Sequence, residues 1–250
     1  DGNGHTIGYT SGSGSNILVF DYQVLNGHNE TNLDYTSSGA LTGTITDTAP
    51  NANIALLTLP LPGAQKSLGA NKDIIIDTTQ PYVTNVTSTK ADGSYKAGVL
   101  IPIQIEFSED VIVTGIPQLL LDIGGPSGYV VHYYSGTGTN TLLFNYTIQS
   151  GHNDTDLDYK ATDSLSLNGG TIKDAAGNDA ARTLATPGTS NSLGSNKDII
   201  IDTTQPYVIN VTSSIGDGSY KFTDTIPIQV VFSENVNVTG LPQITLNLNG

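Results

Sequence analysis

Apolar and polar residues alternate along many short segments of this chain. From Ile101 to Phe107 every second position is apolar, and Gln104 and Glu106 stand between them. A period of two residues turns one side of a strand towards a core and the other towards solvent. The segment therefore predicts a half-buried β-strand.

Strand candidates follow one another at short intervals between residues 79 and 203. Turn formers separate them: the chain has 28 Gly and 11 Pro, residues that favour tight turns. About seven short strands without any sustained helical period predict an all-β protein of tandem immunoglobulin-like, Greek-key β-sandwich domains. The expected strands are 82–87, 100–107, 118–123, 128–134, 141–148, a hairpin of 165–167 with 171–172, and 198–202.

The sequence repeats itself with a period of about 125 residues. NKDIIIDTTQPYV at 71–83 recurs unchanged at 196–208, which is 196 minus 71, or 125, residues later. SGSGSNILVFDY at 11–22 returns as SGTGTNTLLFNY at 135–146. Repetition of this kind is typical of tandem arrays, in which each unit contacts its neighbours.

Only one unit is complete. We expect residues 79–203 to form a whole immunoglobulin-like repeat, 1–78 the C-terminal part of one repeat, and 204–250 the N-terminal part of another, completed by residues 1–78 of the next copy. The expected partner is therefore the chain itself, in a head-to-tail array. The array continues either covalently or by strand complementation between protomers, and the Gly-rich turn at the seam favours the covalent form.

Charge and composition exclude several classes of partner. The chain has 23 acidic and 9 basic residues, a net charge of −14, whereas nucleic-acid binding needs clustered Lys and Arg. No apolar run approaches the ~20 residues that span a bilayer, so we expect no membrane insertion. The absence of Cys and Met leaves no thiol or thioether to oxidise, which fits an extracellular polymer.

Acidic residues recur near strand ends and turns. Asp77 and Asp202 end the last strand of their units, before TTQP, and so mark the junctions. Hard oxygen ligands of this kind bind Ca²⁺. The alternative is that Asp and Asn cap their own turns and that strand-end carboxylates are only solvated. The candidate metal ligands are Asp77, Glu109, Asp110, Asp174, Asn178, Asp202, Glu234, Asp47 and Asn51, the last two expected to match Asp174 and Asn178.

A second acidic group is Asp154, Asp156 and Asp158. Its spacing lacks the Gly and distal Glu of an EF-hand loop. Residues two apart share a strand face, so we expect a surface acidic ladder, with an open cation site as the alternative.

The succession IDTTQPYV, IPIQIEFSEDV, VTGIPQLLLDIGG, SGTGTNTLLFNYTI, DLDY and LNGGTIKDAAGNDA resembles bacterial immunoglobulin-like or cadherin-like tandem repeats. Such repeats belong to large cell-surface adhesins and extracellular filament proteins, and the resemblance covers essentially the whole chain. It implies a sandwich fold, an extracellular or cell-surface location, a spacer or adhesive role, and frequently Ca²⁺ at or near domain junctions.

The sequence therefore predicts a structural repeat of an extracellular filament or adhesin stalk, stiffened by Ca²⁺. The alternative is a carbohydrate- or surface-binding adhesin module, with Tyr133 and Tyr134 as an aromatic platform that the earlier copy, with Tyr9 and Thr10, does not keep. No GxSxG motif, phosphate-binding loop or Cys nucleophile is present, and near-copies offer no unique site. We expect no enzymatic activity.

Overall fold

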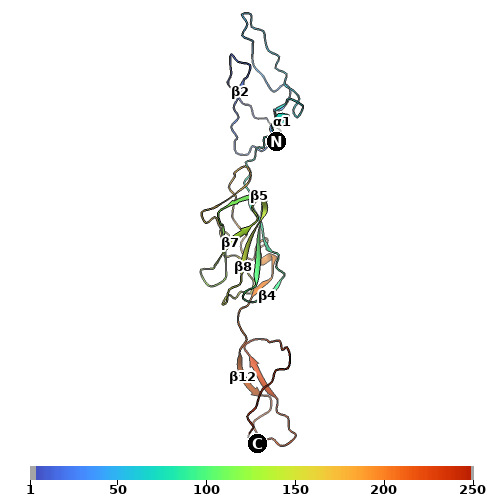
Figure 1. Ribbon diagram of the computed structural model, residues 1–250, viewed down its shortest axis with the longest axis vertical. Helices are drawn as coiled ribbons and strands as arrows, with labels where there is room; N and C mark the ends of the chain where they lie inside the picture. The colour runs from blue at the N-terminus through green and yellow to red at the C-terminus, as the bar shows by residue number, and fades with distance from the viewer. Residues whose placement is uncertain (1–3, 249–250) are drawn as a thin grey trace.

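The computed structural model describes residues 4–248 as three bodies in a line, with the N-terminal and C-terminal segments at opposite ends of a compact middle body (Figure 1). Regular structure is nearly all strand. The two helices are single turns at matching places in the repeat, α1 (Leu68–Asn71) and α2 (Leu193–Asn196).

The middle body is built around one long strand, β5 (Leu100–Thr114). On one side β5 pairs with β3 (Val83–Ser88), and on the other with β8 (Thr139–Thr147). The sheet continues from β8 through β7 (Tyr129–Ser135) to β6 (Gln118–Leu121), and every one of these pairings is antiparallel. The result is a curled antiparallel sheet, consistent with a β-sandwich.

Two short strands extend this sheet at its ends. β9 (Leu165–Ser166) pairs with β6, and β10 (Thr171–Lys173) pairs with the last residues of β5. The predicted hairpin of these two strands is therefore wrong. The turn at 168–170 does form, with Gly170 N donating to Leu167 O at 2.8 Å, but the strands on either side of it pair with different neighbours.

The beginning and the end of the middle body are joined by a pair that the sequence pattern did not predict in full. β4 (Gly93–Tyr95) runs parallel to β11 (Ile199–Ile201). β11 confirms the expected strand at 198–202. β4 was missed because Gly-Ser-Tyr carries no alternating pattern.

The core of the middle body confirms the alternation along β5 and β8. Ile103 of β5 faces Phe144 of β8 in register, Ile105 faces Leu142, and all four side chains are fully buried. Such cross-strand apolar pairs stabilise a sheet. Except for Ile76, the buried hydrophobic residues of the described chain lie between Val86 and Ile201.

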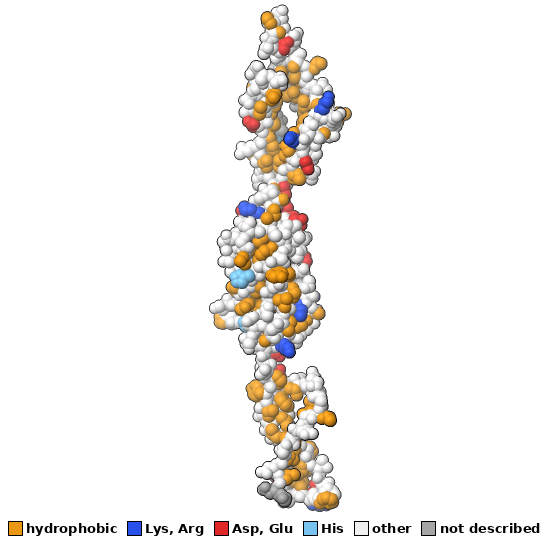
Figure 2. Space-filling model, in the orientation of Figure 1, with side chains coloured by type: hydrophobic (Ala, Val, Ile, Leu, Met, Phe, Trp, Pro, Cys, Tyr) orange, Lys and Arg blue, Asp and Glu red, His pale blue; other side chains and the backbone are white. Residues whose placement is uncertain are grey.

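The two end bodies each repeat a strand pair of the middle body, and few of their described side chains are buried. β12 (Val208–Ser213) pairs with β13 (Ile228–Phe232), as β3 pairs with β5. In the N-terminal segment β1 (Tyr9–Ser11) pairs with β2 (Val19–Phe20). Apolar side chains of both ends lie on the surface, as Figure 2 shows.

Two neighbouring leucines of β8 test this core. Leu142 is buried and Leu143, on the other face, is half-buried. Leu142→Ala should lower the free energy of unfolding of the middle body by about 2–5 kcal/mol, and Leu143→Ala by less than half as much. Urea denaturation of the full chain, followed through the middle body's transition, measures both. Equal losses would contradict the assigned faces.

Candidate metal centre at the repeat junction

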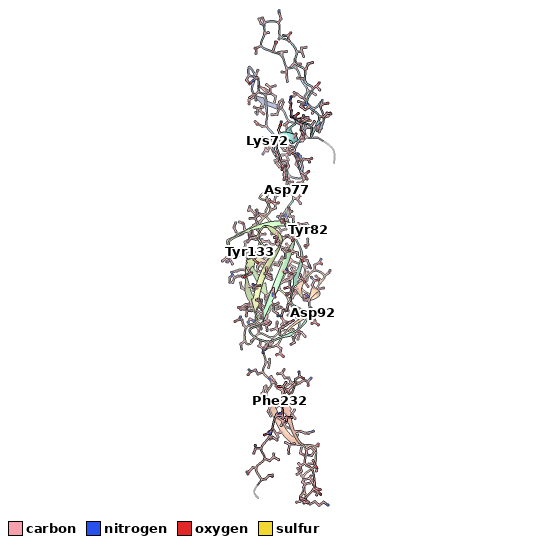
Figure 3. The ribbon with its side chains drawn as sticks, turned by 45° about the vertical axis from the view of Figure 1, so that its right-hand side comes forward. Lys72, Asp77, Tyr82, Asp92, Tyr133 and Phe232 are labelled. Carbon is pink, nitrogen blue, oxygen red and sulfur yellow. The ribbon has the colours of Figure 1, made fainter. Side chains whose placement is uncertain are left out.

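Three carboxylates meet where the first unit joins the middle body. Oxygen atoms of Asp77, Glu109 and Asp174 all lie within 4.8 Å of one another. Figure 3 places Asp77 at the narrow waist above the middle body, and Figure 2 shows acidic side chains gathered there. Glu109 belongs to β5. Asp174 directly follows β10, whose pairing of Lys173 with Ile112 of β5 brings this turn beside Glu109.

Asp174 holds a tight turn as well as facing the other two carboxylates. It is buried, and its Oδ1 accepts hydrogen bonds from Gly177 N at 2.7 Å and Asn178 N at 2.8 Å. Asn178 Nδ2 donates to Asp174 Oδ2 at 2.7 Å and to the carbonyl oxygen of Asp77 at 3.1 Å. Asn178 therefore ties the turn of the middle body to the linker that precedes it.

The linker has its own repeated geometry. Asp77 Oδ1 accepts a hydrogen bond from Thr79 N at 2.9 Å, and Asp202 Oδ1 accepts one from Thr204 N at 3.0 Å. An Asp side chain that binds the backbone two residues ahead forms an Asx turn, which fixes the direction of the chain. The same hydrogen bond therefore fixes the direction in which the chain leaves each unit at both junctions.

The cluster is electrostatically unbalanced. Burial raises the pKa of Glu109, and the negative charges of Asp77 and Asp174 raise it further. In the described part of the chain the salt bridges link Lys160 to Asp122, Lys173 to Asp179 and Lys197 to Asp92, so none reaches the cluster. Carboxylates this close repel unless a proton or a cation neutralises them, and three of them supply the hard oxygen ligands that suit Ca²⁺.

The other nominated residues lie apart from this cluster. Asp110 follows Glu109 in β5 but is exposed. Asp202 and Glu234 stand at the second junction, where Glu234 Oε1 is buried and has no hydrogen-bond partner among the described residues. Asp47 lies in the N-terminal segment.

The pairing of Asp47 with Asn51 is corrected by the structure. Asn53 takes the place of Asn178: Asn53 N donates to Asp47 Oδ1 at 2.9 Å, and Asn53 Nδ2 donates to Asp47 Oδ2 at 2.7 Å. The bond to the Asn53 side chain is the largest cause that lowers the pKa of Asp47. The turn DTAPNAN is two residues longer than DAAGN, so counting positions after the Asp selected the wrong Asn.

The expected surface ladder at 154–158 is also corrected. Asp158 is buried, and it accepts hydrogen bonds from Tyr159 N at 2.8 Å and Gly188 N at 3.0 Å. Asp34 makes the same pair of bonds, to Tyr35 N and Gly63 N. The dipeptide Pro-Gly recurs at 62–63 and 187–188. It was the sequence signal that these Asp side chains hold a loop.

Tyr133 has a structural role that its repeat shares. The Tyr133 hydroxyl accepts a hydrogen bond from Thr137 N at 2.8 Å, and the Tyr9 hydroxyl accepts one from Ser13 N at 2.7 Å. Each tyrosine thus pins the hairpin turn that follows it. Tyr134 is exposed, so it alone remains of the expected aromatic platform.

No protein-family model, curated protein or solved structure matches this chain. Within residues 4–248, no helix has the length and apolar character needed to cross a membrane.

The pH dependence of stability should report the repulsion in the cluster. In the folded chain the pKa of Glu109 is raised above its ordinary value of 4.5, so the folded state takes up this proton at higher pH than the unfolded state. Stability should rise as the pH falls from 7 through the raised pKa, and the gain should be complete below 4.5. Thermal melting in chelator, for the parent and Glu109→Gln, measures it. A pH profile that Glu109→Gln leaves unchanged would contradict the assignment.

Proposed function

We propose that this chain is a structural repeat of an extracellular or cell-surface filament or adhesin stalk, stiffened by Ca²⁺ at its junctions. The observation that carries the proposal is the carboxylate cluster of Asp77, Glu109 and Asp174, which draws ligands from both sides of a junction. An array of near-copies in a line has reach and a defined direction as its main physical properties.

Stiffening follows from where the three ligands come from. Asp77 belongs to the linker that leaves the first unit, whereas Glu109 and Asp174 belong to the middle body. Bending at the linker changes the distances between them. A cation that binds all three holds the two units in one relative orientation, and its removal leaves repelling charges that favour bending.

The strand order supports Greek-key, immunoglobulin-like sandwiches as the repeating unit. β5 lies between β3 and β8, while β6 and β7, which precede β8 in sequence, lie beyond it. A long connection that returns a strand next to an earlier one is the defining feature of a Greek key. Resemblance to repeats of surface adhesins and filament proteins supports the extracellular location.

Glu109→Gln should distinguish the stabilisation that bound Ca²⁺ gives from the stability of the chain without the ion. In the parent chain, Ca²⁺ at about 100 times its Kd should raise the stability of the unit that holds the site by about 2.7 kcal/mol. Glu109→Gln should lose most of this gain, and in chelator it should melt above the parent because one repelling charge is gone. Melting curves with Ca²⁺, with Mg²⁺ and with chelator, together with calorimetric titration of Ca²⁺, measure both effects.

Asp110→Asn is the matched control. It removes a neighbouring, exposed charge from the same strand and should keep the Ca²⁺ response. Stiffness is read from spin labels at Lys72→Cys and Lys96→Cys, one on each side of the junction in a chain with no Cys of its own. The distance distribution should narrow with Ca²⁺. A distribution that Ca²⁺ does not change, or a Ca²⁺ response that Glu109→Gln retains, would refute the junction role.

A further inference from the structure

The peptide group between Asp77 and Thr78 is held from both sides of the first junction. Its N–H, on Thr78, donates to Asn29 Oδ1 at 2.7 Å, and its carbonyl oxygen, on Asp77, accepts from Asn178 Nδ2 at 3.1 Å. Asn29 belongs to the unit before the junction, and Asn178 belongs to the middle body. One peptide plane of the linker is therefore bonded to a side-chain amide of each unit.

The loop that carries Asn29 is itself fixed against the linker. The next residue, Glu30, pairs with Ile76 through two backbone hydrogen bonds of 2.8 Å. Gly27 N also donates to Thr78 Oγ1 at 2.9 Å. Asn29 thus reaches the linker from a loop whose position does not depend on that single bond.

The second junction has the same arrangement on the side of the unit that precedes it. Thr203 N donates to Asn153 Oδ1 at 2.7 Å, and Gly151 N donates to Thr203 Oγ1 at 2.9 Å. Both loops come from the tripeptide Gly-His-Asn, which recurs at 27–29 and 151–153. The bond to the linker is therefore a feature of the repeat.

The held peptide determines where the carboxylate of Asp77 lies. A peptide plane includes the Cα atoms of both residues that it joins, so bonds to its two polar groups also fix the Cα of Asp77. The Asx turn then fixes the side chain, because Asp77 Oδ1 accepts from Thr79 N at 2.9 Å. The result is a carboxylate with an oxygen within 4.8 Å of oxygens of Glu109 and Asp174.

We propose that Asn29 and Asn178 clamp the peptide after Asp77 between two units, and thereby position this carboxylate at the candidate metal centre. The inference rests on the proposed function and deepens it, because it makes the Ca²⁺ affinity of the site depend on a loop of the preceding unit. Hydrogen-bond partners that orient metal ligands in this way are worth about 10- to 100-fold in metal affinity.

The clamp and the cation act on each other through the linker. With both amide bonds in place Asp77 already stands where the cation needs it, so less of the linker has to be ordered on binding. Linkage then requires bound Ca²⁺ to strengthen the clamp by the same factor by which the clamp strengthens Ca²⁺ binding. The junction is therefore partly stiff without Ca²⁺ and stiffer with it.

Two substitutions at Asn29 test the effect on Ca²⁺ affinity. Leu is similar to Asn in shape but offers no acceptor to Thr78 N, so Asn29→Leu should raise the Kd for Ca²⁺ about 10- to 100-fold. Asn29→Asp keeps an acceptor oxygen and should stay within about threefold of the parent. Calorimetric titration of the full chain with Ca²⁺ measures each Kd.

Asn153→Leu is the matched control. It removes the same kind of bond, to Thr203, from the same loop at the second junction, and it leaves the carboxylate cluster at the first junction unchanged. Its Kd for Ca²⁺ should therefore stay within about threefold of the parent. An equal loss of affinity in Asn153→Leu and Asn29→Leu would overturn the inference, because it would indicate a general effect of the loop on stability.

Spin labels at Lys72→Cys and Lys96→Cys measure the clamp without the cation. In chelator, Asn29→Leu and Asn178→Leu should each widen the distance distribution, since each releases the same peptide on one side. Asn153→Leu should leave it unchanged. Parent chains that show these widths but bind no Ca²⁺ would refute the proposed Ca²⁺ role and retain the clamp. Equal widths for all four chains in chelator would overturn the clamp, whatever Ca²⁺ does.

Discussion

An apolar sheet face has to be covered, and the whole chain is organised by that requirement. The alternating strand β5 makes a core because its buried side chains pack in one cluster with those of its sheet neighbour β8 and of the segments that follow. β13 carries the same alternation and is largely exposed among the described residues. Local sequence therefore selects the strands, whereas burial depends on the elements that pack against them.

The junction depends on the same strand pairing. β10 pairs with the end of β5 and thereby holds Asp174 next to Glu109. Asn178 then reaches back to the carbonyl of Asp77. A change in the register of β10 would separate the three carboxylates, so the packing of one sandwich and its orientation to the preceding unit are coupled through one short strand.

Much of the fold followed from the sequence, because period-two alternation and exact repeats are local signals. The long strands were within reach of those signals, and Asp77, Glu109 and Asp174 were among the nine candidate ligands, but which of the nine lie together was not. The partners of β9 and β10 were not, since strand pairing over long sequence separations depends on edges that are free in three dimensions. Burial of Asp158, and the choice of Asn53 over Asn51, depend on loop geometry that equal spacing does not encode.

The net charge of the chain affects how separate chains approach one another. A net charge of −14 makes chains repel one another side by side, as long-range fields of like sign do. Exposed edge strands normally invite unspecific aggregation. Exposed large apolar side chains are most frequent in the two end bodies, and the middle body carries some as well, such as Ile112 and Val130. Units that follow one another in a line (Figure 1) have the reach that the proposed stalk or filament requires.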